Sequence, residues 1–161
     1  MKHIAQYNRH QLCSWINGKA HFNTLITLTL KQGLPCPETG FTSIRREHCA
    51  KTAWLFRDRF TRAILKSAAV RAGARLNLAA FYEGEFDHDK RHHLHLVTEL
   101  PRDIDRLIHL PIQILKVKER LDWAHREFNV KEITRTPYAV IDYLLKEGTD
   151  AFLPEASSFT S

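Results

Sequence analysis

Apolar and polar residues alternate in four stretches of the chain, and this period of two is typical of strands with one buried face. In the first stretch, FNTLITLTLK, the even-numbered residues from Thr24 to Leu30 share one side and the odd-numbered residues share the other. The polar sequence FDHDKR separates the second and third stretches and predicts a hairpin there. The predicted strands are residues 22–31, 76–85, 92–99 and 127–134.

Helix formers and apolar residues at helical spacing occupy most of the chain between these strands. The longest such segment runs from about Ser43 to Ala72 and is closed by Gly73. Proline in a first helical turn predicts two shorter helices, one starting at Pro101 and one running from about Pro111 to about His125.

A last helix is predicted near the end of the chain. Thr136 is its expected N-cap, Pro137 lies in its first turn and Gly148 ends it. Residues 33–42 contain two prolines and two glycines and are predicted as a loop. The polar tail that follows the last helix is predicted to be loose.

The order of these elements is strand, helix, two strands, helix, strand and a last helix. It predicts an α/β fold, a ferredoxin-like or RNA-recognition-like sandwich with a βαββαβ core, an antiparallel sheet and an extra helix at each end. Such a sandwich has helices on one face of the sheet and leaves the other face for an active site. We expect one domain over residues 1–161, with its core at about 22–148.

Composition narrows the class of protein. Hydrophobic residues make up 43% and charged residues 26% of the chain, as in soluble globular proteins. No apolar run approaches the roughly 18 residues that cross a membrane. The N-terminus lacks the apolar stretch of a signal peptide, so we expect a cytoplasmic protein without membrane partners.

The three cysteines are odd in number and form no close pair, which argues against a disulfide framework. Cys36, His48 and Cys49 are conceivable zinc ligands, but their spacing matches no standard zinc motif.

A formal net charge of +6 favours polyanionic partners over acidic or neutral ones. Basic residues are concentrated between Arg45 and Arg75. They either bind nucleic acid or form the solvated face of the long predicted helix. The residues that we expect to contact nucleic acid are Arg45, Arg46, Lys51 and Arg91.

The third predicted strand begins within the sequence RHHLHLV. Because side chains alternate along a strand, His93 and His95 share one face and His92 points to the other. A third metal ligand would come from the preceding strand. We expect Glu85, which is closer to the turn, with Glu83 as the substitute; two exposed hairpin carboxylates are the alternative. Two imidazoles and a carboxylate suit Mg²⁺ or Mn²⁺ acting on a phosphate.

The last predicted helix carries a tyrosine outside its buried face. Tyr143 falls outside the apolar arc and lies one turn before Lys146. A phenolate near a metal that binds phosphate can attack the phosphorus, and Lys146 can stabilise the developing charge or lower the tyrosine pKa. A tyrosine that is merely exposed is the alternative. Placed at about 100° per residue, the buried arc contains Tyr138, Val140, Ile141, Leu144 and Leu145.

Together these motifs resemble those of the HUH endonucleases, specifically the single-tyrosine rolling-circle replication initiators. FNTLITLTL is similar to their first motif, and His93-Leu94-His95 to their histidine-hydrophobic-histidine motif. Tyr143-Leu144-Leu145-Lys146 is similar to their tyrosine-x-x-lysine motif. The resemblance spans residues 22–146, and Glu85 lies where the family often has its acidic ligand.

The resemblance implies that the chain nicks and rejoins single-stranded DNA, or an origin hairpin, of a plasmid or phage. Tyr143 would form a 5′-phosphotyrosine and release a 3′-hydroxyl that primes synthesis, with Mn²⁺ or Mg²⁺ as the cofactor. The chain has no G-x-x-x-x-G-K-[ST] phosphate loop, so a separate helicase, from the host or the element, is an expected partner.

Other protein classes fit parts of the sequence. Insertion-sequence transposases of the same superfamily typically have glutamine where this chain has Lys146. Relaxases usually have three histidines and an N-terminal tyrosine, and Tyr7 is the only candidate for that tyrosine. Histidine-triad hydrolases need a third alternating histidine, but Arg91 and Val97 occupy those positions. A non-enzymatic module that binds RNA or single-stranded DNA would need exposed aromatic residues on its central strands, where only Phe81 is available.

Overall fold

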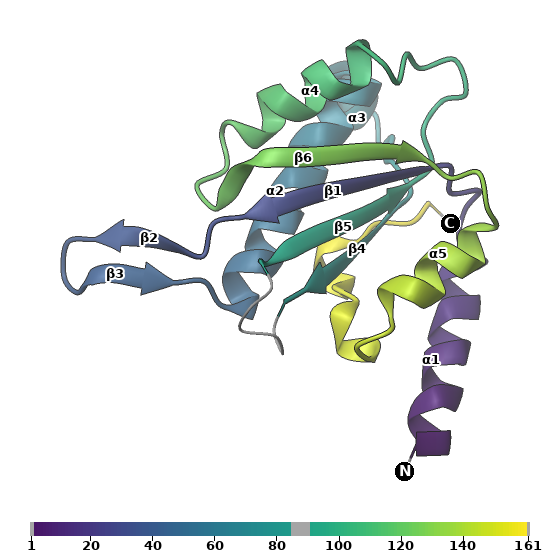
Figure 1. The fold of residues 1–161 in the computed structure, drawn as a ribbon. Coiled ribbons are helices and arrows are strands. Elements are labelled where there is room, and N and C mark those ends of the chain that lie inside the picture. Colours follow the sequence, from purple (N-terminus) through teal and green to yellow (C-terminus); the bar gives the residue numbers. More distant parts are fainter. Residues whose placement is uncertain (1, 85–90, 161) are drawn as a thin grey trace.

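The computed structural model describes residues 2–84 and 91–160, which form a mixed α/β structure around a four-stranded antiparallel sheet (Figure 1). The central strand β1 (Thr24–Leu30) pairs with β5 (His93–Thr98) on one side and β6 (Ala124–Glu132) on the other. β4 (Leu78–Glu83) pairs with β5, so the strand order is β4–β5–β1–β6. All four predicted strands are confirmed, although their ends differ by a few residues.

The predicted helix of residues 43–72 is two helices, α2 (Arg46–Leu65) and α3 (Ser67–Arg71). The break lies at Lys66, whose φ of 69° is left-handed and cannot continue a right-handed helix.

The predicted pair of helices after β5 is one helix, α4 (His109–Lys118), with Pro111 in its first turn. Residues 102–103 and 106–108 form turns instead. The carboxylate of Asp105 accepts hydrogen bonds from the backbone N–H groups of Leu107 and Ile108, which satisfies donors at the start of α4. α4 also ends before residue 125, because β6 already begins at Ala124.

A helix lies at each end of the sandwich, as predicted: α1 (Lys2–Asn17) and α5 (Pro137–Leu144). Thr136 occupies the N-cap position of α5 but makes no side-chain capping hydrogen bond. No helix among the described residues has the length and apolar character needed to cross a membrane.

Two predictions about irregular segments are wrong. The predicted loop at 33–42 is a hairpin of β2 (Gly33–Cys36) and β3 (Gly40–Ser43), in which the ring of Phe41 lies over Gly33. The two-stranded ribbon tolerates Pro35 because its strands have free edges.

The predicted loose tail is held against the sheet. It contains the 3₁₀ turns Thr149–Ala151 and Pro154–Ala156. Phe152 between the turns and Ser158 after the second turn bridge to β4, and Phe152 and Leu153 are buried. Apolar residues within the polar tail therefore complete the core.

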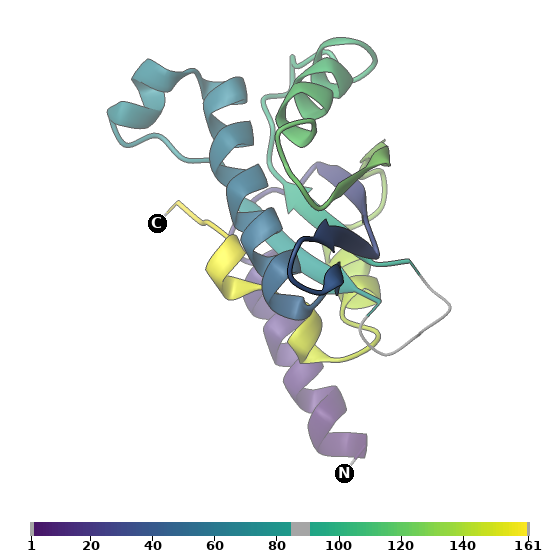
Figure 2. The same cartoon turned by 90° about the vertical axis from the view of Figure 1, so that its left-hand side faces the viewer.

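Helices cover both faces of the sheet (Figures 1 and 2). On one face, α2 and α4 pack on even-numbered strand residues such as Ile26 and Leu94. On the other face, α1 and α5 pack on odd-numbered residues such as Phe81 and Val97. The expectation of helices on one face holds for α2 and α4 only, because these odd-numbered apolar residues also need cover.

Candidate active site

The strand register brings the predicted histidines to the face that α5 partly covers. His93 lies opposite Glu83 of β4 and Thr29 of β1, and His95 lies opposite Phe81 and Thr27. The predicted shared face of His93 and His95 is therefore confirmed. His92 points to the other face, as predicted, where its ring stacks on Tyr82.

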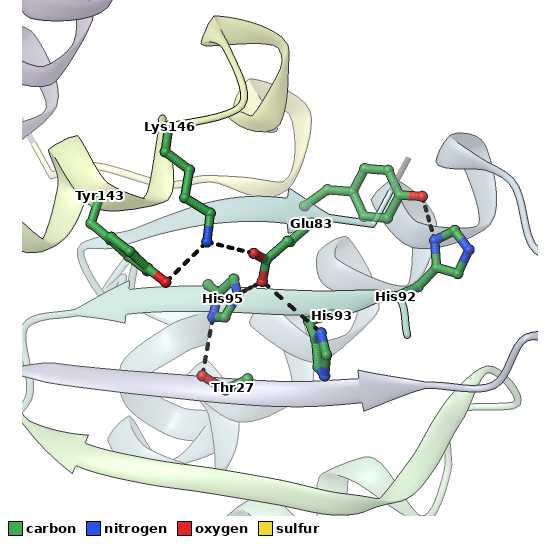
Figure 3. A network of polar contacts seen from close by, with 8 residues as sticks. Thr27, Glu83, His92, His93, His95, Tyr143 and Lys146 are labelled. Atoms are coloured by element: carbon green, nitrogen blue, oxygen red, sulfur yellow. Dashed lines mark hydrogen bonds and ion pairs between the residues drawn. The ribbon is translucent and has the colours of Figure 1, made fainter. Parts of the chain in front are cut away.

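The carboxylate of Glu83 lies beside both imidazoles (Figure 3). Its Oε2 is 2.9 Å from His95 Nε2 and 4.0 Å from His93 Nδ1. A carboxylate only accepts hydrogen bonds, so His95 Nε2 carries the proton. On the other side of the ring, His95 Nδ1 is hydrogen-bonded to the Thr27 hydroxyl at 3.1 Å. Thr27 thereby sets the ring orientation of His95.

The predicted lysine, just after α5, reaches the same carboxylate and also contacts the predicted tyrosine in α5 (Figure 3). Lys146 Nζ donates to Tyr143 Oη at 3.0 Å and lies 2.8 Å from Glu83 Oε1. The buried face of α5 is confirmed, since Ile141, Leu144 and Leu145 are buried. This burial turns Tyr143 outward, and the residue is 60% exposed.

Electrostatics fixes the charges of this cluster at neutral pH. Hydrogen bonds from His95 and then Lys146 lower the pKa of Glu83 to about 2, against the opposing effect of burial. Burial opposes the charge on Lys146, but its contacts with Glu83 and Tyr143 outweigh that effect and raise its pKa. Burial, and then the neighbouring His95, lowers the pKa of His93. Glu83 is therefore an anion, Lys146 a cation and His93 a neutral imidazole with a free lone pair.

Glu83, the substitute in the sequence-based prediction, occupies the expected position of the acidic ligand. Glu85, the first choice, lies outside the described residues. The donors His93, His95 and Glu83 suit Mn²⁺ or Mg²⁺ in kind. Among the side chains that the structure describes, in residues 8–84 and 91–160, no three histidine, cysteine or acidic side chains are arranged to hold a metal. A cation at this cluster would have to replace the hydrogen bond between Glu83 and His95.

The residues predicted to contact DNA do not gather at this cluster. Arg45, Arg46 and Lys51 lie at or near the start of α2, which packs on the opposite face of the sheet. Arg91 lies two residues before β5, and its guanidinium pairs with Glu127 of β6 at 3.0 Å.

Three functional candidates were missed by sequence reasoning. Alternation along 22–31 places Thr27 on one side of its strand, but only the register reveals its contact with His95. Arg9 of α1 and Asp142 of α5 form an ion pair at 2.9 Å beside the tyrosine. Sequence carries no signal for that pair, because its members are 133 residues apart.

Two other predictions can be examined in the structure. Phe81 is fully buried beneath α1 and the tail, so it offers no platform for stacking a base. Cys36 is a free cysteine in β2, whereas Cys49 is buried in α2 and His48 stacks on Trp123. Neither a stacking surface at Phe81 nor a zinc site at these cysteines is formed.

Models of known protein families, curated proteins and solved structures were compared with the chain, and none matches it. The geometry of the cluster is therefore the basis for assigning a function.

Proposed function

We propose that this chain is a single-tyrosine HUH endonuclease that nicks and rejoins single-stranded DNA to initiate rolling-circle replication of a plasmid or phage. The proposal is carried by one observation: a continuous chain of contacts from Tyr143 through Lys146 and Glu83 to His95. These residues come from α5 and its end, from β4 and from β5.

The strand order supports the finer description of the fold. Counting only β1, β4, β5 and β6, the order across the sheet is second, third, first, fourth, with neighbours antiparallel. This is the order expected of a ferredoxin-like βαββαβ core, with α2 and α4 as its two connecting helices.

Tyr143 is the proposed nucleophile. Its Oη would form a bond to the phosphorus while the bond from phosphorus to the 3′-oxygen breaks. The departing 3′-oxygen takes up a proton and becomes the hydroxyl that primes synthesis. Because Tyr143 is exposed and Lys146 is already protonated, the phenolic proton passes to solvent. Rejoining is the reverse reaction, with a 3′-hydroxyl attacking the phosphotyrosine.

Lys146 stabilises the phenolate, since its ammonium lies 3.0 Å from Tyr143 Oη. Glu83 holds that ammonium in place from the other side. A Lys146 side chain also favours the replication initiators over the transposases of the superfamily, which typically have glutamine there.

A divalent cation is the proposed cofactor. When bound by His93, His95 and Glu83, Mn²⁺ or Mg²⁺ would supply positive charge to a non-bridging phosphate oxygen. Thr27 orients His95 for this task through its hydrogen bond. We further propose a single-domain cytoplasmic enzyme that works with a separate helicase at an origin hairpin.

Covalent capture tests the proposal. Single-stranded oligonucleotides that tile the DNA flanking the gene, hairpins included, are labelled at the 3′ end and incubated with the protein and Mn²⁺. We expect label to migrate with the protein on a denaturing gel, to require metal and to disappear in Tyr143→Phe.

Tyr138→Phe is the matched control, because Tyr138 lies in the same helix but contacts His10 instead of Lys146. Label that persists in Tyr143→Phe and disappears in Tyr138→Phe would identify Tyr138 as the nucleophile. Binding without any covalent product on every oligonucleotide would favour the non-enzymatic nucleic-acid-binding module.

A further inference from the structure

A second candidate binding site lies on the opposite face of the sheet from Tyr143. α2 and α4 pack side by side there (Figure 2). Between them is a groove of about 380 Å³. Its lining residues are Arg59, Arg62, Ala63, Gln113, Lys116, Val117 and Arg120.

The groove carries positive charge on both walls. Arg59 and Arg62 come from α2, and Lys116 and Arg120 come from the end of α4 and the turn after it. No acidic residue is among the lining residues, although Arg62 pairs with the neighbouring Asp58 at 3.0 Å. Cations gathered on one concave surface repel one another and attract an anion.

A hydrogen bond also joins the two walls of the groove. Arg59 Nη1 donates to the main-chain oxygen of Arg120 at 2.8 Å, so a side chain of one wall is anchored on the other. Arg62, Lys116 and Arg120 remain exposed and available to a ligand. The two helices thus form a fixed groove that presents three exposed cations.

We infer that this groove binds the phosphodiester backbone of double-stranded DNA. The identity of the polyanion as DNA rests on the proposed function, whereas the site itself does not. Arginine and lysine bind phosphate oxygens without reading sequence. The lining residues include no aromatic side chain, so the groove has no platform for unpaired bases. A duplex, whose bases are stacked inside, is the nucleic acid that such a surface fits.

This site would hold a duplex segment, such as a hairpin stem, on the helical face. Single-stranded DNA would meanwhile lie at Tyr143 on the other face. The two activities can be separated by mutation, because no residue of the groove contacts the Tyr143–Lys146–Glu83–His95 cluster.

Binding of a fluorescein-labelled 20-base-pair duplex of arbitrary sequence tests the inference, with the full chain and fluorescence anisotropy at several salt concentrations. The groove variant is Arg62→Gln/Lys116→Gln/Arg120→Gln. The control variant Arg71→Gln/Arg102→Gln/Arg135→Gln removes the same charge from exposed positions outside the groove.

We expect the groove variant to lose roughly tenfold or more in duplex affinity at 0.1 M salt. The slope of log affinity against log salt should fall in magnitude by about 2 to 3, because each phosphate contact contributes about 0.9. The control variant should change affinity by less than about threefold. Arg62→Lys/Arg120→Lys keeps the charges and should bind nearly as the wild type does, which guards against a groove variant that fails to fold.

Equal losses in the groove and control variants would overturn the inference, since net charge alone would then explain binding. If polyglutamate of matched charge displaced the labelled duplex as effectively as unlabelled duplex does, this would also overturn the inference and favour an acidic protein partner. Covalent capture by Tyr143 without duplex binding would refute the groove and leave the proposed function standing. Duplex binding at the groove without covalent capture would refute the proposed function and leave the groove standing as a binding site.

Discussion

The side chain of Arg9 in α1 binds both the side chain and the main chain of Asp142, the residue immediately before Tyr143 in α5. Arg9 Nε donates to Asp142 Oδ1 at 2.9 Å, and Nη2 donates to the Asp142 carbonyl oxygen at 2.6 Å. The N-terminal helix therefore fixes the helix that carries the candidate nucleophile.

Loss of this contact should affect both stability and rate. We expect Arg9→Ala to lower the free energy of unfolding by about 1 kcal/mol, since the pair is partly exposed. It should also slow covalent capture roughly three- to tenfold, because small misplacements of a nucleophile are costly. Urea unfolding and single-turnover kinetics measure the two effects.

Arg71→Ala, at an exposed position of α3, is the control for Arg9→Ala and should change neither quantity. The affinity for the single strand should be the same in both variants. A slower Arg9→Ala enzyme whose deficit lies wholly in DNA affinity would contradict a positioning role.

The hydroxyl of Thr27 should matter for metal affinity. Thr27→Val keeps the shape but removes the hydrogen bond to His95 Nδ1, and we expect the affinity for Mn²⁺ to fall about tenfold. Thr29→Val is the matched control on the same strand face, opposite His93. Titration with Mn²⁺ followed by electron paramagnetic resonance measures both. Identical losses in the two variants would show that the His95 contact is not the cause.

The charge of Lys146 should set the rate of the first chemical step. Lys146→Gln removes the ammonium that faces Tyr143 Oη, and we expect covalent capture to slow by roughly 10²-fold. Lys146→Arg keeps a cation and should recover part of the rate. Rapid-quench measurement at saturating DNA separates this effect from binding. A Lys146→Arg rate as low as that of Lys146→Gln would mean that geometry rather than charge is required.

Cys36 should be the reactive cysteine of the chain. Hydrogen bonds from Thr39 and Thr42 lower the pKa of its thiol to about 6, so the thiolate predominates at pH 7. We expect its alkylation by iodoacetamide to rise through a midpoint near pH 6. Cys13 and Cys49 are buried and should not react in the native protein. Peptide mass spectrometry after timed alkylation identifies the modified cysteine, and Thr39→Val should move the midpoint upward.

The sequence alone determined the four strands of the sheet and the faces of those strands and of the last helix. A period of two specifies which residues of a strand share a side, so the common face of His93 and His95 could be predicted without knowing their neighbours. The arc of apolar residues in the last helix likewise placed Tyr143 outside the core, since burial follows helical periodicity.

Tertiary structure decided everything that depends on which elements meet. Strand order and register brought Thr27 against His95 and chose Glu83 among the described acidic residues. Packing of α1 on α5 created the pair of Arg9 and Asp142, and the crossing of α2 with α4 gathered the groove cations. These contacts join residues far apart in the chain, and local propensity and periodicity reach only a few residues along it.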